Sequence, residues 1–424
     1  MSAIRIRPGP ANGTVRAPPS KSYTHRALVV GHLAARPFRI RHPLDSDDTR
    51  ATADAVSRLG TPVSRARDVW RVDPPGDRRR RTPILVQCHE SGTTLRFVSA
   101  LAARSDRTVV IAGAGRLAER PIDQLLEGLR ALGASGRHLG GRGLPIEVHG
   151  PMRGGRVALN ASETSQFASA LLLTLPTLEG DSVLELTGKL VSKPYLEATL
   201  AVLAHHGIRV DRKRRRFQIP GGQRFRREGF TVPGDASSAA YLWAAAAVSG
   251  GTVRVDGVPA TWPQADLAAL DLLRDAGATV SRRPGGATVS GGTPKAFRVD
   301  LTDAPDLYPL AGVLAATSPG ASHIVGAEHA VLKESDRKAG TALLARCLGA
   351  EVESTSYGLC IRGTRRPRAF DLRRLSDHRL VMSAAVGALA AEGDSILGEK
   401  EAVRKSFPGF WDAFAILLEG GRGR

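Results

Sequence analysis

The chain has 424 residues, with 60 Lys and Arg against 41 Asp and Glu and a formal net charge of +19. This length predicts two or three domains, and an apolar share of 42% excludes a wholly disordered chain. Three cysteines, Cys88, Cys347 and Cys360, are too few for a disulfide framework. No apolar run reaches the roughly 20 residues that a membrane span needs, and the amino terminus lacks a signal-peptide core. We therefore expect a cytoplasmic protein.

One kind of segment recurs six times along the chain: an apolar strand, a turn, an amphipathic helix and a closing glycine. The segments span residues 38–60, 108–133, 182–207, 252–277, 322–349 and 394–420. Their closing glycines are Gly60, Gly133, Gly207, Gly277, Gly349 and Gly420. Successive glycines are 73, 74, 70, 72 and 71 residues apart. Because glycine after a periodic helix is typical of a left-handed C-terminal cap, we expect this conformation at all six.

A second, more apolar helix is predicted before each of these segments. The six helices lie within residues 20–35, 91–103, 165–178, 235–250, 306–318 and 377–393. They are apolar nearly all round and open with Ser or Asp, so we expect buried helices with N-caps. The repeating unit of about 72 residues is then a buried helix, a strand, an exposed helix and short strands.

Six units divide most simply into two domains of three. We expect a first domain at 17–230 and a second formed by 1–16 with 231–424. The strand near the amino terminus, AIRIRPG, would then pair back with the second domain.

The positive charge is carried mainly by arginine, since only nine of the 60 basic residues are Lys. This skew is typical of genome composition. The dense clusters at 78–81 and 212–216 precede strand-like runs and are predicted as solvated loops; a footprint for nucleic acid is the alternative. Only 5% of residues are aromatic and none interleaves with these clusters, which disfavours nucleic-acid binding.

Lysines are concentrated at predicted helix starts. The four at such positions are Lys21, Lys193, Lys333 and Lys405. A cation there opposes the helix dipole, so a functional reason is indicated, and Lys can lose a proton where Arg cannot. Asp306 and Glu334 supply carboxylates near these cations, although N-capping alone is an alternative for Asp306. These residues predict a two-domain enzyme that binds two small anions at helix N-termini.

At these residues the sequence resembles the 5-enolpyruvylshikimate-3-phosphate synthases, the enolpyruvyl transferases of the shikimate pathway. The motifs that carry the resemblance are PSKSYTHRAL (19–28), LDSDDT (44–49), SGTTLR (91–96), ERPI (119–122), SQF (165–167), LVSKPY (190–195), GDASSA (234–239), LKESDR (332–337), SDHR (376–379) and KSFPGF (405–410). The resemblance covers essentially the full chain.

The resemblance implies a two-domain inside-out α/β barrel of six βαβαββ units, with the active site in the interdomain cleft. It implies transfer of the enolpyruvyl group of phosphoenolpyruvate to the 5-hydroxyl of shikimate 3-phosphate by addition and elimination, with phosphate released. No cofactor, metal, nucleic-acid or membrane partner is implied, and a monomer is expected. Glyphosate is an inhibitor of this family, and we expect Gly92→Ala to weaken its inhibition.

The family's functional residues carry over by motif. Those implied to hold phosphoenolpyruvate are Lys21, Gly92, Arg120, Gln166, Arg337, Arg379 and Lys405. Those implied to hold shikimate 3-phosphate are Lys21, Ser22, Arg26, Thr164, Ser165, Gln166, Ser192, Tyr195, Asp306, His329 and Lys333. Asp306 would accept the hydroxyl proton, and Lys333, Glu334 and Lys21 would complete the catalytic group.

Several positions depart from the family's usual residues. They are Glu90 for Asn, Phe97 for Pro, Thr164 for Ser, His329 for Asn and Val331 for Arg. None of them removes a group that the chemistry requires.

Other functions remain as alternatives. The enolpyruvyl transferase acting on UDP-N-acetylglucosamine carries a reactive Cys about five residues before the arginine of ERPI, where this chain has Gly115. A nucleic-acid-binding protein is less favoured. An RNA-end cyclase is an analogue at the level of fold alone.

Overall fold

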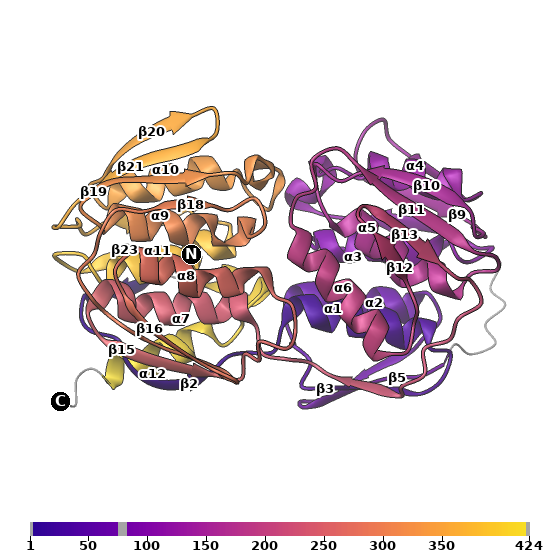
Figure 1. Cartoon of the computed structure of the whole chain (residues 1–424), viewed down its shortest axis with the longest axis horizontal. Coiled ribbons are helices and arrows are strands. Elements are labelled where there is room, and N and C mark those ends of the chain that lie inside the picture. Colours follow the sequence, from indigo (N-terminus) through magenta and orange to yellow (C-terminus); the bar gives the residue numbers. More distant parts are fainter. Residues whose placement is uncertain (1–2, 75–82, 421–424) are drawn as a thin grey trace. The chain divides into compact units, whose positions relative to one another are not determined.

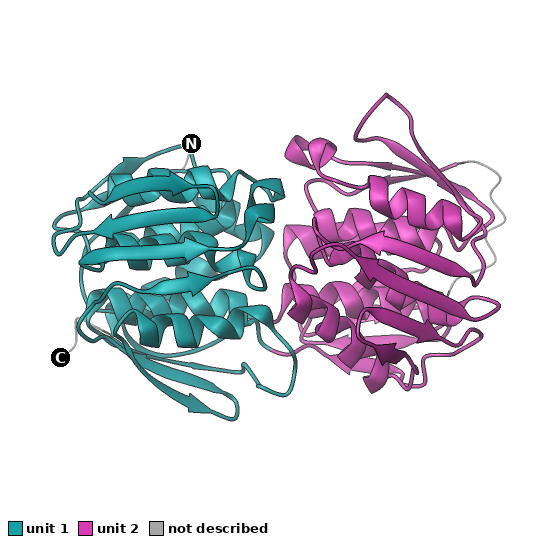
Figure 2. Ribbon diagram, turned by 45° about the horizontal axis from the view of Figure 1, so that its top comes forward, with its two compact units in different colours: residues 1–18, 234–424 teal, residues 19–233 magenta. Residues whose placement is uncertain are grey.

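The computed structural model describes residues 3–74 and 83–420, so the arginine cluster at 78–81 lies outside the described residues. The chain divides into two compact units, which are described separately below. Unit 1 comprises residues 1–18 and 234–424, and unit 2 comprises residues 19–233 (Figure 2).

The described strands of unit 2 form three four-stranded sheets. The first has the order β14 (Gly229–Thr231), β3 (Phe38–Arg41), β5 (Val69–Val72), β4 (Val63–Arg65). The second has the order β6 (Ile84–Gln87), β7 (Thr108–Ala112), β9 (Ile146–His149), β8 (Ser135–His138). The third has the order β10 (Arg156–Asn160), β11 (Ser182–Thr187), β13 (Arg216–Ile219), β12 (Asp211–Lys213). In each sheet the first pair is parallel and the other two pairs are antiparallel.

Unit 1 repeats this plan over its described strands. Its first sheet has the order β2 (Asn12–Arg16), β15 (Thr252–Asp256), β17 (Gly286–Ser290), β16 (Thr279–Arg283). Its second has the order β18 (Arg298–Asp300), β19 (Gly320–Val325), β21 (Gly358–Gly363), β20 (Glu351–Thr355). Its third contains β22 (Asp371–Leu372), β23 (Ser395–Leu397) and β1 (Ile4–Ile6). The amino-terminal strand therefore pairs with the last strand of the chain, antiparallel to it, within unit 1.

Helices lie inside each unit and the sheets surround them (Figure 1). The buried helices are α1 (Lys21–Leu33), α3 (Gly92–Ala102), α5 (Gln166–Thr174), α7 (Ala236–Ser249), α9 (Tyr308–Ala316) and α11 (His378–Ala388). Every residue of α9 and α11 is buried. The second helix of each repeat is α2 (Asp47–Arg58), α4 (Asp123–Ala131), α6 (Lys193–His205), α8 (Ala269–Asp275), α10 (Arg337–Cys347) or α12 (Phe410–Glu419). The repeat read from the sequence is thus confirmed as an inside-out α/β fold.

The left-handed conformation is confirmed for five of the six closing glycines and is wrong for the last. Their φ angles are +107° at Gly60, +90° at Gly133, +76° at Gly207, +104° at Gly277 and +91° at Gly349. Gly420 has a φ of −60° because its N–H continues the helical pattern by donating to the carbonyl of Ile416 at 3.1 Å.

The predicted loop at 212–216 is in part wrong, since these residues form a hairpin between β12 and β13 with Arg214 at the turn. Arg212 donates to Glu197 at 2.6 Å and lies over the ring of Phe217. Both contacts are with residues of unit 2, so they give Arg212 a structural role on the surface of that unit. Across the described residues, none of the helices combines the length and apolarity of a membrane span.

Candidate active site

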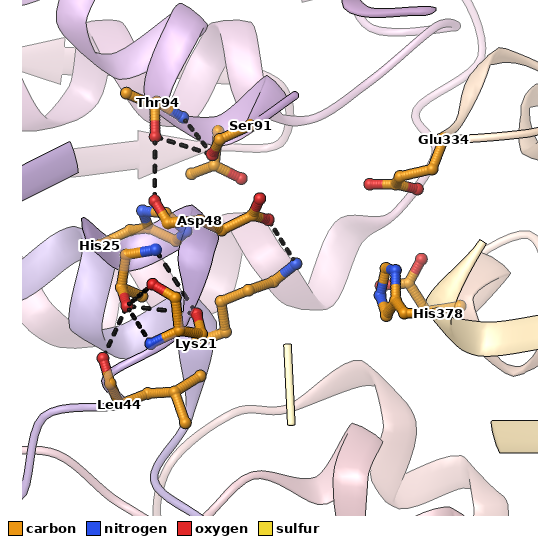
Figure 3. A network of polar contacts seen from close by, with 12 residues as sticks. Lys21, His25, Leu44, Asp48, Ser91, Thr94, Glu334 and His378 are labelled. Carbon is orange, nitrogen blue, oxygen red and sulfur yellow. Dashed lines mark hydrogen bonds and ion pairs between the residues drawn. The ribbon is translucent and has the colours of Figure 1, made fainter. Parts of the chain in front are cut away.

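In unit 2, hydrogen bonds join the amino-terminal ends of several helices. Lys21, the first residue of α1, donates from Nζ to Oδ2 of Asp48 at 2.8 Å, near the start of α2 (Figure 3). Oγ1 of Thr94, in the first turn of α3, lies 3.3 Å from the carbonyl oxygen of Asp48 and 2.7 Å from Oγ of Ser91. Lys21 therefore presents its ammonium where helix N–H groups also gather, which is a suitable place for an anion.

Neutral groups pack behind this ion pair. Nδ1 of His25 lies 2.7 Å from Oγ1 of Thr52, which in turn lies 2.6 Å from Oγ1 of Thr94. Burial lowers the pKa of His25 to about 3, so its ring is neutral near pH 7. The positive charge at this point is consequently that of Lys21.

Gly92 begins α3 beside two arginine side chains. A Cβ atom added at Gly92 would lie 2.7 Å from Cζ of Arg120 and would also collide with the guanidinium of Arg96. Arg120 follows the 3-10 helix η1 (Gly115–Glu119). Gln166, the first residue of α5, donates from Nε2 to Oγ1 of Thr93 at 3.2 Å. Three residues implied for phosphoenolpyruvate are thus close to the start of α3.

Arg26 joins α1 to α6 through its guanidinium. It is 3% exposed and donates to Thr199 at 2.9 Å, to the carbonyl of Ser22 at 2.9 Å and to the carbonyl of Tyr195 at 2.8 Å. Its Cζ lies 5.6 Å from the centre of the Phe97 ring, so the departure at 97 supplies a cation–π partner. Through these contacts Arg26 links α1 to α6.

The remaining implied residues of unit 2 lie at the starts of α5 and α6. Thr164 accepts from the N–H of Gln166 at 3.1 Å, and Ser165 is the N-cap of α5 without a side-chain capping bond. Ser192 precedes α6 with a φ of +55°, and Lys193 is the first residue of that helix. Ser165 therefore occupies the predicted N-cap position of α5, but its side chain does not make the capping hydrogen bond.

In unit 1, six charged residues form one cluster, called the charged cluster below. Its members are Asp306, Lys333, Glu334, Arg337, Asp377 and Arg379. They come from the starts of α9, α10 and α11 and from the segment before α10. Arg337 is 1% exposed and donates to Asp306 at 2.5 Å, to Glu334 at 2.6 Å and to Asp377 at 3.0 Å. Arg379 donates to the second oxygen of Asp306 at 2.6 Å.

Asp306 is held as an ion by three cations. Nζ of Lys333 lies 3.7 Å from its Oδ1, in addition to the bonds from Arg337 and Arg379. Burial alone would raise its pKa, but the charges of Arg379, Lys333 and Arg337 hold that pKa well below its usual value. The N-cap of α9 is Leu307, so the alternative of simple N-capping by Asp306 is wrong.

Two further residues of unit 1 are implied by the resemblance, His329 and Lys405. His329 is buried in the 3-10 helix η5 (Glu328–Leu332), which ends one residue before Lys333. Lys405 ends the 3-10 helix η6 (Lys400–Lys405), which packs against α11.

The sequence did not predict the interactions of Asp266 and Asp377. Asp377 was identified only as an N-cap, which it is, but it also binds Arg337. Asp266 is 1% exposed in the 3-10 helix η3 (Ala265–Ala268), and Arg379 and Asp306 both affect its pKa. Its place in the repeat was a usable signal, because Asp266 lies 11 residues before Gly277 and Asp48 lies 12 before Gly60.

We expect Gly92→Ala to lower kcat/KM for phosphoenolpyruvate by about 10- to 100-fold, because the new methyl displaces the guanidinium groups of Arg120 and Arg96. Inhibition by glyphosate is expected to weaken in parallel. Gly140→Ala is the control, since a Cβ there meets no atom within 4 Å. Steady-state kinetics that show the same kcat/KM and inhibition for both variants and the unaltered chain would contradict this.

Comparisons with known proteins show which family the sequence matches. The family model described as EPSP synthase (3-phosphoshikimate 1-carboxyvinyltransferase) matches residues 6–414. A 3-phosphoshikimate 1-carboxyvinyltransferase of Thermococcus kodakarensis is 40% identical over 416 residues, which cover 98% of this chain and 100% of the relative. One of Halobacterium salinarum is 39% identical and covers 97% and 98%. An EPSP synthase structure from Acinetobacter baumannii has a TM-score of 0.81 at 23% identity, covering 99% of this chain and 98% of that chain.

Proposed function

Because the chain belongs to the EPSP synthase family, we propose that the residues gathered in unit 2 and the charged cluster of unit 1 act on the same two substrates. The family's reaction transfers the enolpyruvyl group of phosphoenolpyruvate to shikimate 3-phosphate, and the chain catalyses this transfer in the shikimate pathway. The assignment of single residues to each substrate is the proposal.

The observation that carries the proposal is the set of cations placed at helix N-termini in both units. Lys21 lies at the start of α1, and Arg337 and Arg379 lie in the first turns of α10 and α11. Both substrates are multiply charged anions that repel each other in water. Ammonium and guanidinium groups fixed by neighbouring carboxylates bind such anions without reorganising during the reaction.

We assign phosphoenolpyruvate and shikimate 3-phosphate to overlapping sets of residues. Phosphoenolpyruvate binds Lys21, Gly92, Arg120, Gln166, Arg337, Arg379 and Lys405. Shikimate 3-phosphate binds Lys21, Ser22, Arg26, Thr164, Ser165, Gln166, Ser192, Tyr195, Asp306, His329 and Lys333. For Arg26 the support is indirect, since three of its N–H groups already bind protein oxygens.

The proposed route is addition followed by elimination. The 5-hydroxyl oxygen forms a bond to C2 of phosphoenolpyruvate while its proton passes to Asp306 and C3 takes a proton from the Lys333–Glu334 pair. The C2–O bond to phosphate then breaks as C3 returns its proton to the Lys333–Glu334 pair, which restores the double bond, and the departing phosphate takes up the proton that Asp306 had accepted. The side chains named supply every proton transfer, so the route uses no cofactor.

Asp306 is a weak base while three cations bind it. The substrate anion competes for Arg337 and Arg379, and each bond that it takes from Asp306 raises the pKa of that carboxyl. Anion binding thus prepares the base that the addition step needs.

The alternative specificity for UDP-N-acetylglucosamine is not favoured. Gly115 occupies the position of that enzyme's reactive Cys with a φ of +55°, and an added Cβ would collide with the carboxylate of Glu90. A cysteine side chain would require Glu90 to move, and the match to the EPSP synthase family also disfavours this alternative.

The cytoplasm and a monomeric state are also proposed. The described cysteines Cys88, Cys347 and Cys360 are free thiols, which suits a reducing compartment.

The assignment of Lys21 is tested by Lys21→Met. We expect kcat/KM for both substrates to fall by at least about 100-fold, because the variant loses a charge aimed at both anions. Lys213→Met, in the exposed hairpin of unit 2, is the control and should behave as the unaltered chain. Kinetics and circular dichroism are measured together, and a folded Lys21→Met protein with unchanged kcat/KM would remove Lys21 from the site.

A further inference from the structure

The outer face of the first sheet of unit 2 carries arginines to which the proposed reaction assigns no part. Arg39 and Arg41 lie on β3 and are exposed, whereas Phe38 and Ile40, which alternate with them, are buried. Successive side chains of a strand point to opposite faces of the sheet. Arg39 and Arg41 therefore lie side by side on the face of this sheet that points away from the core.

A third arginine adds to the positive charge of this face. Arg71, on β5, lies directly opposite Arg39 and is also exposed. Like charges at opposed positions of an antiparallel pair repel each other. The second sheet of unit 2 shows the balanced arrangement, since Arg137 lies opposite Glu147 and forms an ion pair with it at 2.8 Å. The pair of Arg39 and Arg71 has no such balance across its strands.

These arginines line a hollow of about 620 Å³, called the arginine hollow below. Its lining includes Arg39, Arg41, Arg71, Arg227, Glu228 and Gly229, all of which belong to unit 2. Among the described residues that line it, four guanidinium groups thus meet a single carboxylate. That carboxylate is in part directed to another cation, because Oε1 of Glu228 lies 3.7 Å from Nη1 of Arg36.

Gly229 keeps one side of the arginine hollow open. It lies on β14 opposite Arg39, and a Cβ atom there would lie 2.6 Å from the carbonyl oxygen of Arg39. The same atom would lie 3.4 Å from Nη1 of Arg41. The guanidinium of Arg41 therefore reaches across to β14, where no side chain of Gly229 covers it.

The arginine hollow presents N–H groups that other described residues do not use. The side chains of Arg39 and Arg41 make no ion pair or hydrogen bond with the described part of the chain. Arg71 and Arg227 are held through Nε, by a carboxylate and by a backbone carbonyl respectively, at 2.6 Å each. Their terminal Nη groups remain available to a ligand, and the bonds at Nε fix the two side chains in place.

Guanidinium groups arranged in this way suit a chain of phosphate groups. Each planar fork can bind two phosphate oxygens, and several forks around one hollow can bind successive phosphates. The volume lies within the usual range of small-molecule sites. Its lining contains no aromatic side chain on which a nucleobase could stack, which disfavours a nucleic acid.

We propose that the arginine hollow is a second anion site, which binds a linear oligophosphate through Arg39, Arg41, Arg71 and Arg227. The four cations neutralise the ligand's charge, and the ligand in turn relieves the repulsion between Arg39 and Arg71. None of these four residues is assigned to either substrate, so this inference does not depend on the proposed function.

The test is isothermal titration calorimetry with sodium triphosphate as the probe. The titration is made at low ionic strength with saturating shikimate 3-phosphate, so that the probe does not enter that substrate's site. We expect the Kd for triphosphate to rise by at least about 10-fold in the double variant Arg39→Gln/Arg41→Gln, because two charge-assisted contacts are lost. Its kcat and both KM values should stay unchanged. Arg227→Gln should also weaken triphosphate binding and gives an independent second variant.

The matched control removes the same charge elsewhere. Arg137→Gln/Arg362→Gln takes two exposed arginines from sheets in which each lies opposite a glutamate. This variant has the same net charge as Arg39→Gln/Arg41→Gln and should bind triphosphate as the unaltered chain does. Circular dichroism shows whether each variant is folded.

Three results would overturn the inference. Equal Kd values for the two double variants would show a general attraction of triphosphate to a basic chain, without a site. Triphosphate binding that is absent, or that shikimate 3-phosphate abolishes, would leave the arginine hollow without its ligand. A single-stranded oligonucleotide that binds more tightly than triphosphate, and is lost in Arg39→Gln/Arg41→Gln, would assign the hollow to nucleic acid instead.

Discussion

Asp306→Asn is expected to lower kcat by about 10²- to 10⁴-fold, the usual contribution of a positioned general base. The amide keeps the shape of the side chain but cannot accept the proton of the 5-hydroxyl. It also removes the anion that binds Arg337, Arg379 and Lys333 in the free enzyme. Because the substrate no longer competes with a carboxylate, the KM for phosphoenolpyruvate is expected to stay the same or to fall.

The split between kcat and KM is the informative part of this measurement. A loss of substrate binding alone would raise KM and leave kcat unchanged. Circular dichroism and a thermal melt show whether the variant is folded. A folded Asp306→Asn enzyme with near-normal kcat would exclude Asp306 as the base. A large rise in the KM for phosphoenolpyruvate would show that Asp306 helps to bind this substrate and does not compete with it for the cations.

Arg337→Met is expected to destabilise the protein by about 3–5 kcal/mol, the usual cost of breaking a buried ion pair from one side. Arg337 donates to Asp306, Glu334 and Asp377, and its side chain is 1% exposed. Burial alone would lower its pKa, but the carboxylates of Asp377, Glu334 and Asp306 raise it. Without the guanidinium, these acids either remain buried as uncompensated charges or take up protons.

Denaturant unfolding of unit 1, followed near neutral pH, measures this effect. Arg366→Met is the matched control, because the side chain of Arg366 forms an exposed ion pair with Glu392 at 3.6 Å. The destabilisation should shrink at low pH, because Asp306 and Asp377, whose pKa values are held down in part by the charge of Arg337, bind protons there and no longer need that charge. An Arg337→Met protein as stable as Arg366→Met would show that the charged cluster does not depend on this guanidinium.

The repeat could be predicted from the sequence because residues that end helices recur at the same place in each unit. Glycines such as Gly60 and Gly133 end the helices in a conformation that other residues rarely adopt. Apolar helices such as α9 and α11 have no polar face, so they had to be interior. Gly420 shows the limit of this reasoning, because a glycine at the right spacing is permitted, but not obliged, to have a positive φ.

The candidate site was predictable as a set of residues but not as a set of partners. The scarcity of lysine and the family motifs indicated Lys21 and Lys333, since these features are local in the chain. That Arg337 binds three carboxylates depends on the meeting of α9, α10 and α11, which spacing alone does not specify. Asp266 was missed for the same reason, because the sequence does not show that this acid is buried and accepts a hydrogen bond from Ser237.

Phosphate release is the most direct test of the account. Purified protein is mixed with phosphoenolpyruvate and shikimate 3-phosphate, and inorganic phosphate and the enolpyruvyl product are measured together. We predict one phosphate for each enolpyruvyl group transferred, and none when shikimate 3-phosphate is omitted or replaced by UDP-N-acetylglucosamine. Release that requires UDP-N-acetylglucosamine, or no release from folded protein with both proper substrates, would contradict the function assigned to this chain.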